Sequence, residues 1–386
     1  MNMSIPGRMI GKSSRHLLVA TGAILLALYA AGAAAASSPD QRSGDTLARA
    51  TIIPALDSTP TATPVPHPLV PGVPPTPVAI SSPGCCSYPG WSEDSEWVLF
   101  IDAPEGVGSS AVYSIPRGGG PRTLLTKRFG AFSSDWSLVA YPDAGRMYIE
   151  RWQDGERWTV PSAGREIHFS PSASSVAWQI GSSSIQNPDV QVSTIWVSDV
   201  KGKDARELVT LHGGSLIGWA EDEDALIVSG RLTPAGPAGI WRIQMDDGAG
   251  RLLFDVNEPR EAVLSPDGRL LAFIVAFETQ PGRNGLWILS TNGDGAHRLD
   301  LFGSYRWRSA DQLVLIPFDW SSSSAYLLQY DALNGEWWSL TSPRYTQLAI
   351  ANNDWQISPD GGWMVYQSFE DQSLNLLQLP AVPGSP

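Results

Sequence analysis

The sequence predicts an all-β fold, a β-propeller of seven four-stranded blades, with six blades as the alternative count. Short apolar segments separated by turn residues recur along the chain, and no stretch with helical periodicity follows residue 36. The 16 Trp, 37 Gly and 31 Pro residues form a composition typical of strands joined by turns. Four short strands in about forty residues are the size of one propeller blade.

The stretch Val263–Leu301 shows the repeating unit most clearly. An apolar segment runs into the turn Ser265–Gly268, with the sequence Ser-Pro-Asp-Gly. Pro fixes one backbone angle of such a turn, Asp bonds to its own backbone, and Gly tolerates positive φ. Further apolar segments follow at Leu270–Phe277, Leu286–Leu289 and Leu299–Leu301. We therefore interpret this stretch as one blade.

The same frame recurs seven times. A large apolar residue, which we call the anchor, precedes each turn, and a strand-like run begins about six residues later. Successive anchors are 37 to 50 residues apart. The anchors are Trp91, Phe132, Phe169, Trp219, Leu264, Trp307 and Ile357.

Two of these repeats resemble the repeat of TolB-like propellers, a WD-repeat-like family. Leu264–Phe273 and Ile357–Tyr366 carry the Ser-Pro-Asp-Gly turn followed by a strand, and five further repeats keep the pattern but lose the Pro, the Gly or both. The resemblance covers roughly residues 85–380 and implies the propeller fold. It does not imply a function, because propellers host many functions. TolB-like pectin lyases use a histidine-rich metal site, whose pattern this sequence does not reproduce.

The chain is expected to contain four parts. Residues 1–36 combine basic residues, an apolar core and an Ala-rich end, which indicate a signal peptide; an uncleaved membrane anchor over residues 17–36 is the alternative. Residues 37–84 form a Pro/Thr-rich disordered linker. Residues 85–380 form the propeller, and residues 381–386 a C-terminal tail. We therefore expect a secreted or cell-envelope protein, outside the cytoplasm.

The last repeat supplies only three strands. A ring leaves no free strand edge if a segment from the other end of the chain completes the last blade. The segment Val78–Ser82 is therefore predicted to pair with Leu374–Leu379.

The formal net charge of −13 disfavours nucleic acid and anionic membranes as partners. The charge is interpreted either as a solubility feature or as complementarity to a cationic partner. The only two cysteines, Cys85 and Cys86, are adjacent, which leaves a vicinal disulfide, free thiols and an intermolecular bridge open.

Catalytic motifs are absent from the sequence. His168, which precedes the anchor Phe169, and Arg306 are candidates for side chains that face the central channel, with a buried core histidine as the alternative for His168. No catalytic residue, metal ligand or cofactor is predicted. Any membrane contact is expected through the N-terminal segment alone, and the protein is expected to be a monomer.

The longer connections, which join the second to the third strand of a blade and one blade to the next, open on the same face. We call this the long-loop face and the opposite one the short-turn face. Function concentrates on such loops, so we expect a non-catalytic scaffold that binds a protein or peptide there. The alternative is a carbohydrate-active or metal-dependent enzyme, a lyase or hydrolase, with a site at the channel mouth. The predicted binding residues are Asp102, Glu105, Asp189, Phe277, Glu278, Trp320, Tyr345, Phe369, Glu370 and Asp371.

Overall fold

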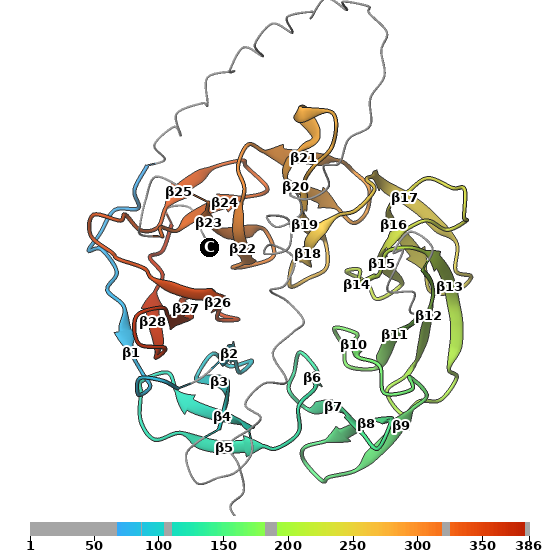
Figure 1. Cartoon of the computed structure of the whole chain (residues 1–386), viewed down its shortest axis with the longest axis horizontal. Helices are drawn as coiled ribbons and strands as arrows, with labels where there is room; N and C mark the ends of the chain where they lie inside the picture. The colour runs from blue at the N-terminus through green and yellow to red at the C-terminus, as the bar shows by residue number, and fades with distance from the viewer. Residues whose placement is uncertain (1–67, 86, 104–109, 182–190, 319–324, 383–386) are drawn as a thin grey trace, which may run out of the picture. The chain divides into compact units, whose positions relative to one another are not determined.

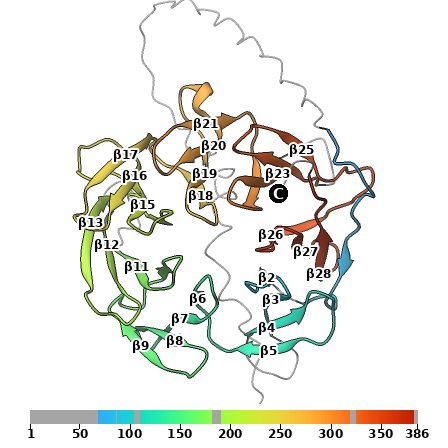
Figure 2. The ribbon, with the colours of Figure 1, turned by 180° about the vertical axis from the view of Figure 1, so that it is seen from behind.

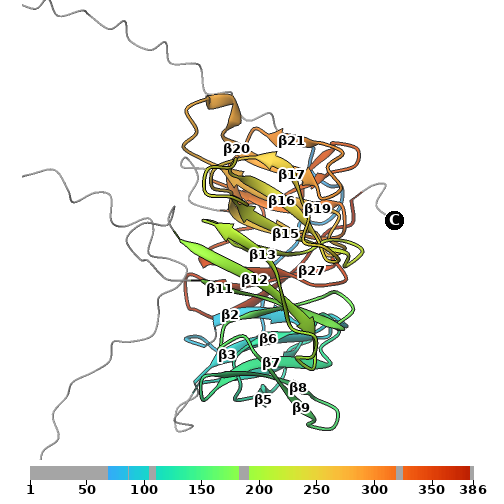
Figure 3. The same cartoon turned by 90° about the vertical axis from the view of Figure 1, so that its right-hand side faces the viewer.

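The computed structural model describes residues 68–85, 87–103, 110–181, 191–318 and 325–382, all within one compact unit, Pro66–Pro386. These residues form seven four-stranded antiparallel sheets arranged around a centre (Figures 1 and 2). The predicted propeller is therefore confirmed, and its count is seven blades. Seen edge-on, the strands run from one face of the ring to the other (Figure 3).

Each blade is numbered in chain order and its strands run from the centre outward. Blade 1 holds β2 (Ser87–Trp91), β3 (Trp97–Asp102), β4 (Ala111–Pro116) and β5 (Thr123–Thr126); blade 2 holds β6 (Ala131–Phe132), β7 (Leu138–Asp143), β8 (Arg146–Arg151) and β9 (Arg157–Val160). Blade 3 holds β10 (Ile167–Phe169), β11 (Ser175–Gly181), β12 (Val192–Asp199) and β13 (Arg206–His212); blade 4 holds β14 (Leu216–Trp219), β15 (Ala225–Gly230), β16 (Gly239–Gln244) and β17 (Gly250–Asp255).

The remaining blades follow the same order. Blade 5 holds β18 (Arg260–Leu264), β19 (Leu270–Val275), β20 (Gly285–Ser290) and β21 (Ala296–Leu299), with the 3-10 helix η2 (Pro281–Arg283) between β19 and β20. Blade 6 holds β22 (Gly303–Trp307), β23 (Gln312–Pro317), β24 (Leu328–Asp331) and β25 (Trp337–Ser339). Blade 7 holds β26 (Ile350–Ile357), β27 (Trp363–Ser368), β28 (Leu374–Gln378) and, outermost, β1 (Val78–Ala79).

Strand β1 closes the ring as predicted. Val78 pairs with Leu376 and Ala79 with Asn375, and Ile80 N donates to Leu374 O at 2.8 Å. The predicted linker, residues 37–84, is described from residue 68 onward. This part bonds to blade 6 as well, because Val70 N donates to Ser339 O at 3.0 Å. The last blade is therefore completed by a segment nearly 300 residues earlier in the chain.

The turn after each anchor explains why the repeat survives without its glycine. In blade 5, Ser265 Oγ donates to Asp267 Oδ1 at 2.7 Å and accepts from Leu270 N at 3.0 Å. Gly268 then has a φ of 74°. In four other blades a non-glycine residue has a φ between 56° and 60° at this place; these residues are Ser95, Trp136, Ala173 and Glu223. The turn geometry thus persists where the sequence signature is lost.

Three Trp anchors also join neighbouring blades. Trp91 Nε1 donates to Gln356 O (3.4 Å), Trp219 Nε1 to His168 O (3.1 Å) and Trp307 Nε1 to Val263 O (3.0 Å). In each pair the accepting carbonyl belongs to the residue before the anchor of the preceding blade. An anchor indole therefore satisfies an inner-strand carbonyl of its neighbour, a bond that a Phe, Leu or Ile anchor cannot make.

Replacing Trp219 by Phe is expected to lower the free energy of unfolding by about 2 kcal/mol, because a buried carbonyl loses its donor and the smaller ring leaves a void. Chemical denaturation would measure the change. Trp97→Phe is the matched control, since that side chain is 41% exposed and its indole makes no hydrogen bond within the described residues. Equal effects of the two substitutions would contradict the role of the anchor.

Cys85 is buried and disulfide-bonded, which removes the free-thiol alternative for this residue. Cys86 lies outside the described residues.

Candidate functional site

Exposed aromatic side chains gather on the long-loop face. Eight large aromatic residues are exposed in the described part of the chain, and seven of them lie in connections or strand ends of this face. The eighth, Trp97, begins β3 at the short-turn side. The seven are Tyr88, Phe129, Phe277, Phe302, Phe318, Tyr345 and Phe369. Exposed aromatics rimmed by polar residues mark interaction surfaces.

Most of these rings lie on adjacent blades. Phe318 N donates to Phe302 O at 2.9 Å, so these two residues of blade 6 are neighbours. Tyr345 follows in the connection from blade 6 to blade 7, and Phe369 lies in the β27–β28 loop of blade 7. The backbone N of Phe369 donates to Ala349 O at 2.8 Å. Aromatic residues are thus displayed on loops that backbone hydrogen bonds hold in place.

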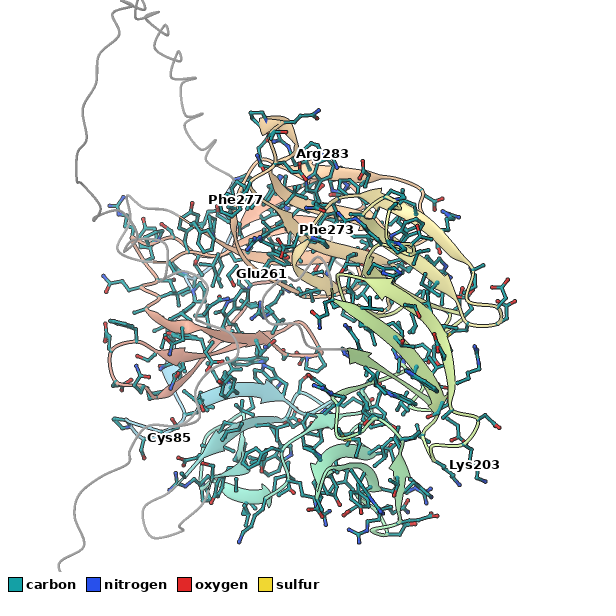
Figure 4. The ribbon with its side chains drawn as sticks, turned by 45° about the vertical axis from the view of Figure 1, so that its right-hand side comes forward. Cys85, Lys203, Glu261, Phe273, Phe277 and Arg283 are labelled. Atoms are coloured by element: carbon teal, nitrogen blue, oxygen red, sulfur yellow. The ribbon has the colours of Figure 1, made fainter. Side chains whose placement is uncertain are left out.

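Phe277, the most exposed of them at 88%, has a left-handed backbone with a φ of 65°. Its loop is closed by a reciprocal pair of bonds, because Glu278 N donates to Asn284 Oδ1 at 2.9 Å and Asn284 Nδ2 donates to Glu278 O at 3.0 Å. Arg260 lies 5.4 Å from the centre of the Phe277 ring. Figure 4 labels Phe277 together with Glu261 of the same blade. The chain thus holds an exposed ring in a conformation that bulky residues rarely adopt.

Tyr88 repeats this combination in blade 1. It is 68% exposed and has a φ of 53°, at a bulge where the register of β2 and β3 shifts between Ser87 and Gly90. Its backbone N donates to Asp354 Oδ2 at 2.8 Å. Bulges and strained residues are common next to functional sites, where they direct side chains.

A charged cluster lies on the innermost strands beside Tyr88. The guanidinium of Arg306 is 5.1 Å from the centre of the Trp355 ring, and its Nη1 donates to Tyr305 O at 2.7 Å. The hydroxyl of Tyr305 donates to Glu261 O. Burial lowers the pKa of Arg306 and raises that of Tyr305, while the charges of Glu261 and Asp354 favour the charged form of Arg306. We call Glu261, Tyr305, Arg306 and Asp354 the channel-mouth cluster.

Burial raises the pKa of Asp354 above its ordinary value, although Tyr88 N and Arg306 oppose the shift. A raised pKa means that the folded state binds a proton more readily than the unfolded state. The contribution to stability is therefore most favourable below the unfolded pKa of about 3.9 and is lost as pH rises through the folded pKa. At neutral pH the buried charge of Asp354 therefore lowers the free energy of unfolding.

Asp354→Asn is accordingly expected to maintain or raise the melting temperature at pH 7, because Asn keeps an acceptor for Tyr88 N without the buried charge. The gain should shrink as pH falls toward 4. Melting curves across this range would measure it, with Asp143→Asn, an exposed residue, as the control. A lower melting temperature at pH 7 would show that the charge of Asp354 stabilises the fold.

Of the residues predicted for the long-loop face, Phe277, Tyr345, Phe369, Glu370 and Asp371 are exposed there. Two of the predicted carboxylates also form bonds within the fold. Asp102 pairs with Arg122, and Asp371 Oδ1 accepts from Ser373 N (3.0 Å) and Ser373 Oγ (2.7 Å), bonds that lower the pKa of Asp371. Glu278 is half-buried beside Phe277. Glu105, Asp189 and Trp320 lie outside the described residues.

The two channel candidates differ in their surroundings. Arg306 belongs to the channel-mouth cluster. His168 lies in β10, where burial lowers its pKa despite the nearby Glu166, and where its carbonyl accepts the bond from Trp219. The described residues bring no three His, Cys, Asp or Glu side chains together in a group that could hold a metal ion.

Sequence reasoning missed Tyr88, Phe129, Phe302 and Phe318. Phe318 begins the connection between the second and third strands of blade 6, which belongs to the long connections, so its place in the chain could have indicated its exposure. Phe302 lies directly before an inner strand, and its exposure depends on how blade 6 packs. Tyr88 lies at a bulge, and no sequence pattern predicted that bulge.

No protein-family model matches the sequence, and no curated protein does. The fold is nevertheless similar to solved structures. One is an oligogalacturonate lyase in complex with manganese (15% identity, 81% of this chain and 99% of that chain, TM-score 0.57). Another is the oligogalacturonate lyase of Vibrio parahaemolyticus (10% identity, 79% and 93%, TM-score 0.59). A third is TolB from Acinetobacter baumannii (15% identity, 81% and 66%, TM-score 0.37).

At such identities the similarity concerns the fold alone. With its seven four-stranded blades, the protein is a seven-bladed β-propeller in architecture. No helix in the described part of the chain is long and apolar enough to cross a membrane.

Proposed function

We propose that this propeller is a non-catalytic scaffold that binds a protein or peptide through its long-loop face. The observation that carries the proposal is the one-sided distribution of exposed aromatics, seven of eight on this face within the described residues. Aromatic side chains provide large contact areas at low cost in side-chain entropy and dominate the energy of many interfaces. A rigid ring that holds them in advance also reduces the ordering needed on binding.

Acidic residues accompany the rings and suggest the charge of the partner. Glu258, Glu261 and Glu370 are exposed on the same face, although Glu258 pairs with Arg260 at 3.3 Å. Together with the net charge of −13, they favour a cationic partner whose association weakens as salt rises. We also propose that the protein is located outside the cytoplasm, because residues 1–36 resemble a signal peptide. It is proposed to act as a monomer. Mass spectrometry of the mature N-terminus distinguishes cleavage near Ala36 from a retained anchor.

The test is capture followed by direct measurement. Immobilised protein should retain one defined partner from an envelope extract of the producing cell, and the purified partner should bind in solution with an affinity that falls as salt rises. Binding that salt leaves unchanged would contradict the charge assignment. A partner whose binding is insensitive to the exposed rings would contradict the proposed face.

The alternative is a carbohydrate-active or metal-dependent enzyme, and the channel-mouth cluster is the observation that favours it. Buried groups with shifted pKa values, such as Asp354 and Arg306, also mark active sites. Incubation with oligogalacturonate, with and without Mn²⁺, tests this alternative. Turnover that Asp354→Asn or His168→Ala abolishes would replace the binding proposal by an enzymatic one.

A further inference from the structure

A groove of about 390 Å³ lies between blades 1 and 2 at the short-turn side, away from the long-loop face. Trp97, Leu99 and Leu125 of blade 1 line it, and Trp136 of blade 2 completes the apolar wall. Its polar lining includes Glu93 and Asp94, in the turn between β2 and β3. Neither the proposed function nor the channel-mouth cluster uses any of these residues.

At one position blade 1 carries a smaller side chain than the other blades do. Ser114 of β4 lies opposite Leu99, eight residues after the anchor Trp91. Blades 4 and 6 carry the longer polar residues Arg242 and Gln329 at the equivalent third-strand position. The remaining four blades place a branched aliphatic residue there, where it fills the space toward the next blade. These residues are Ile149 of blade 2, Val197 of blade 3, Ile288 of blade 5 and Leu376 of blade 7. The small Ser114 leaves that space open.

The turns around the groove are also less tightly joined than others. Ser134 Oγ donates to Pro171 O at 2.8 Å between the turns of blades 2 and 3, and Asp360 N donates to Ser95 Oγ at 3.0 Å between those of blades 7 and 1. Between the described turns of blades 1 and 2, residues 92–96 and 133–137, no such hydrogen bond forms. The seam is therefore open at the place where the side chain is small.

Of the two indoles of the groove, Trp136 is held by stacking and Trp97 is exposed. Trp136 has a φ of 56° and stacks on Phe132, with ring centres 4.4 Å apart and planes 24° apart. Trp97 is 41% exposed. Two indoles that line one groove suit a ligand with a flat or positively charged group.

The charge of the lining selects between ligand classes. Glu93 is exposed and makes no hydrogen bond or ion pair within the described residues, and no Lys or Arg lines the groove. Hydrogen bonds lower the pKa of Asp94, and the bond that Ser92 Oγ donates at 2.5 Å has the largest effect. Asp94 is therefore ionised at neutral pH. Aromatic faces beside two carboxylates without a cation are complementary to an ammonium or guanidinium group.

We propose that this groove binds a Lys or Arg side chain of a basic peptide, between Trp97 and Trp136 and beside the carboxylates of Glu93 and Asp94. This second site is independent of the proposed function of the long-loop face. A neutral sugar, which would also stack on Trp, is the competing occupant that the experiment must separate.

The test titrates the full-length protein with an acetylated hexa-arginine amide peptide, with calorimetry as the readout. Saturable binding that weakens with salt is expected. Trp97→Leu should weaken it about tenfold, within the range that one cation–π contact supplies, and Glu93→Gln by about two- to fivefold. Glu336→Gln is the matched control: it removes the same charge on the short-turn face, from a hairpin of blade 6.

Ser114→Ile provides a test that misfolding cannot mimic, because it introduces the residue that blades 2 and 5 carry at this position. It should fill the groove, keep or raise the melting temperature, and abolish peptide binding. The proposal is overturned if wild-type protein does not bind the peptide, or if Trp97→Leu and Ser114→Ile bind it as tightly as wild type does. It is equally overturned if maltohexaose occupies the groove and displaces the peptide.

Discussion

Deletion of residues 1–82 is expected to lower the melting temperature by roughly 10 °C or more. The deletion removes β1 and the backbone bonds of Val70 and Ile80 to blades 6 and 7. It also removes the buried Val70 side chain, which is 7% exposed in the core of these blades. Several hydrogen bonds of about 1 kcal/mol each and the burial of one or two aliphatic side chains amount to about 5 kcal/mol. A free strand edge would also remain on β28.

Deletion of residues 1–67 is the matched control. It removes most of the N-terminal segment but keeps every described contact, so its melting curve should coincide with that of the full chain. Differential scanning calorimetry of the two truncations gives the comparison. If both melt like the full chain, closure by β1 contributes nothing measurable and the ring is held by its blades alone.

Replacing Phe318 and Phe369 together by Ala is expected to weaken partner binding by about 4 kcal/mol, roughly a thousandfold. The two rings are 59% and 70% exposed and belong to the adjacent blades 6 and 7. Such exposure means that the substitutions remove contact area without opening a cavity, so the melting temperature should not change. Calorimetry with the purified partner measures the loss.

Leu333→Ala serves as the control for this pair. Leu333 is also 70% exposed, but it lies in the β24–β25 hairpin on the short-turn face. Its removal should leave partner binding unchanged. The opposite pattern, in which Leu333→Ala weakens binding and the double substitution does not, would mean that the working face is the other one.

The fold could be predicted because each repeat carries its own signal. Anchors such as Trp219 and Leu264 combine a large apolar residue with a turn of fixed geometry, and that geometry tolerates the loss of Gly, as Glu223 shows with its φ of 56°. Closure by β1 followed from counting strands in the last repeat. These are local patterns, and their repetition made the count reliable.

The site was less accessible to sequence reasoning because it depends on exposure and packing between blades. Phe277 and Phe369 were predicted, since they lie in long connections. Asp102 was predicted for the same reason, yet its carboxylate pairs with Arg122 within its own blade. The groove beside Ser114 arises from a missing side chain at an interface between blades, which only the aligned strand registers reveal.

Site-specific photo-crosslinking in the producing cell tests the central claim, that the long-loop face is the binding surface. A photoreactive amino acid is placed at Phe318, Tyr345 or Phe369 on that face, and at Leu333 or Lys201 on the short-turn face. The account predicts that the long-loop positions crosslink one common partner and that the short-turn positions do not crosslink it. Crosslinks to that partner from the short-turn positions alone would contradict it.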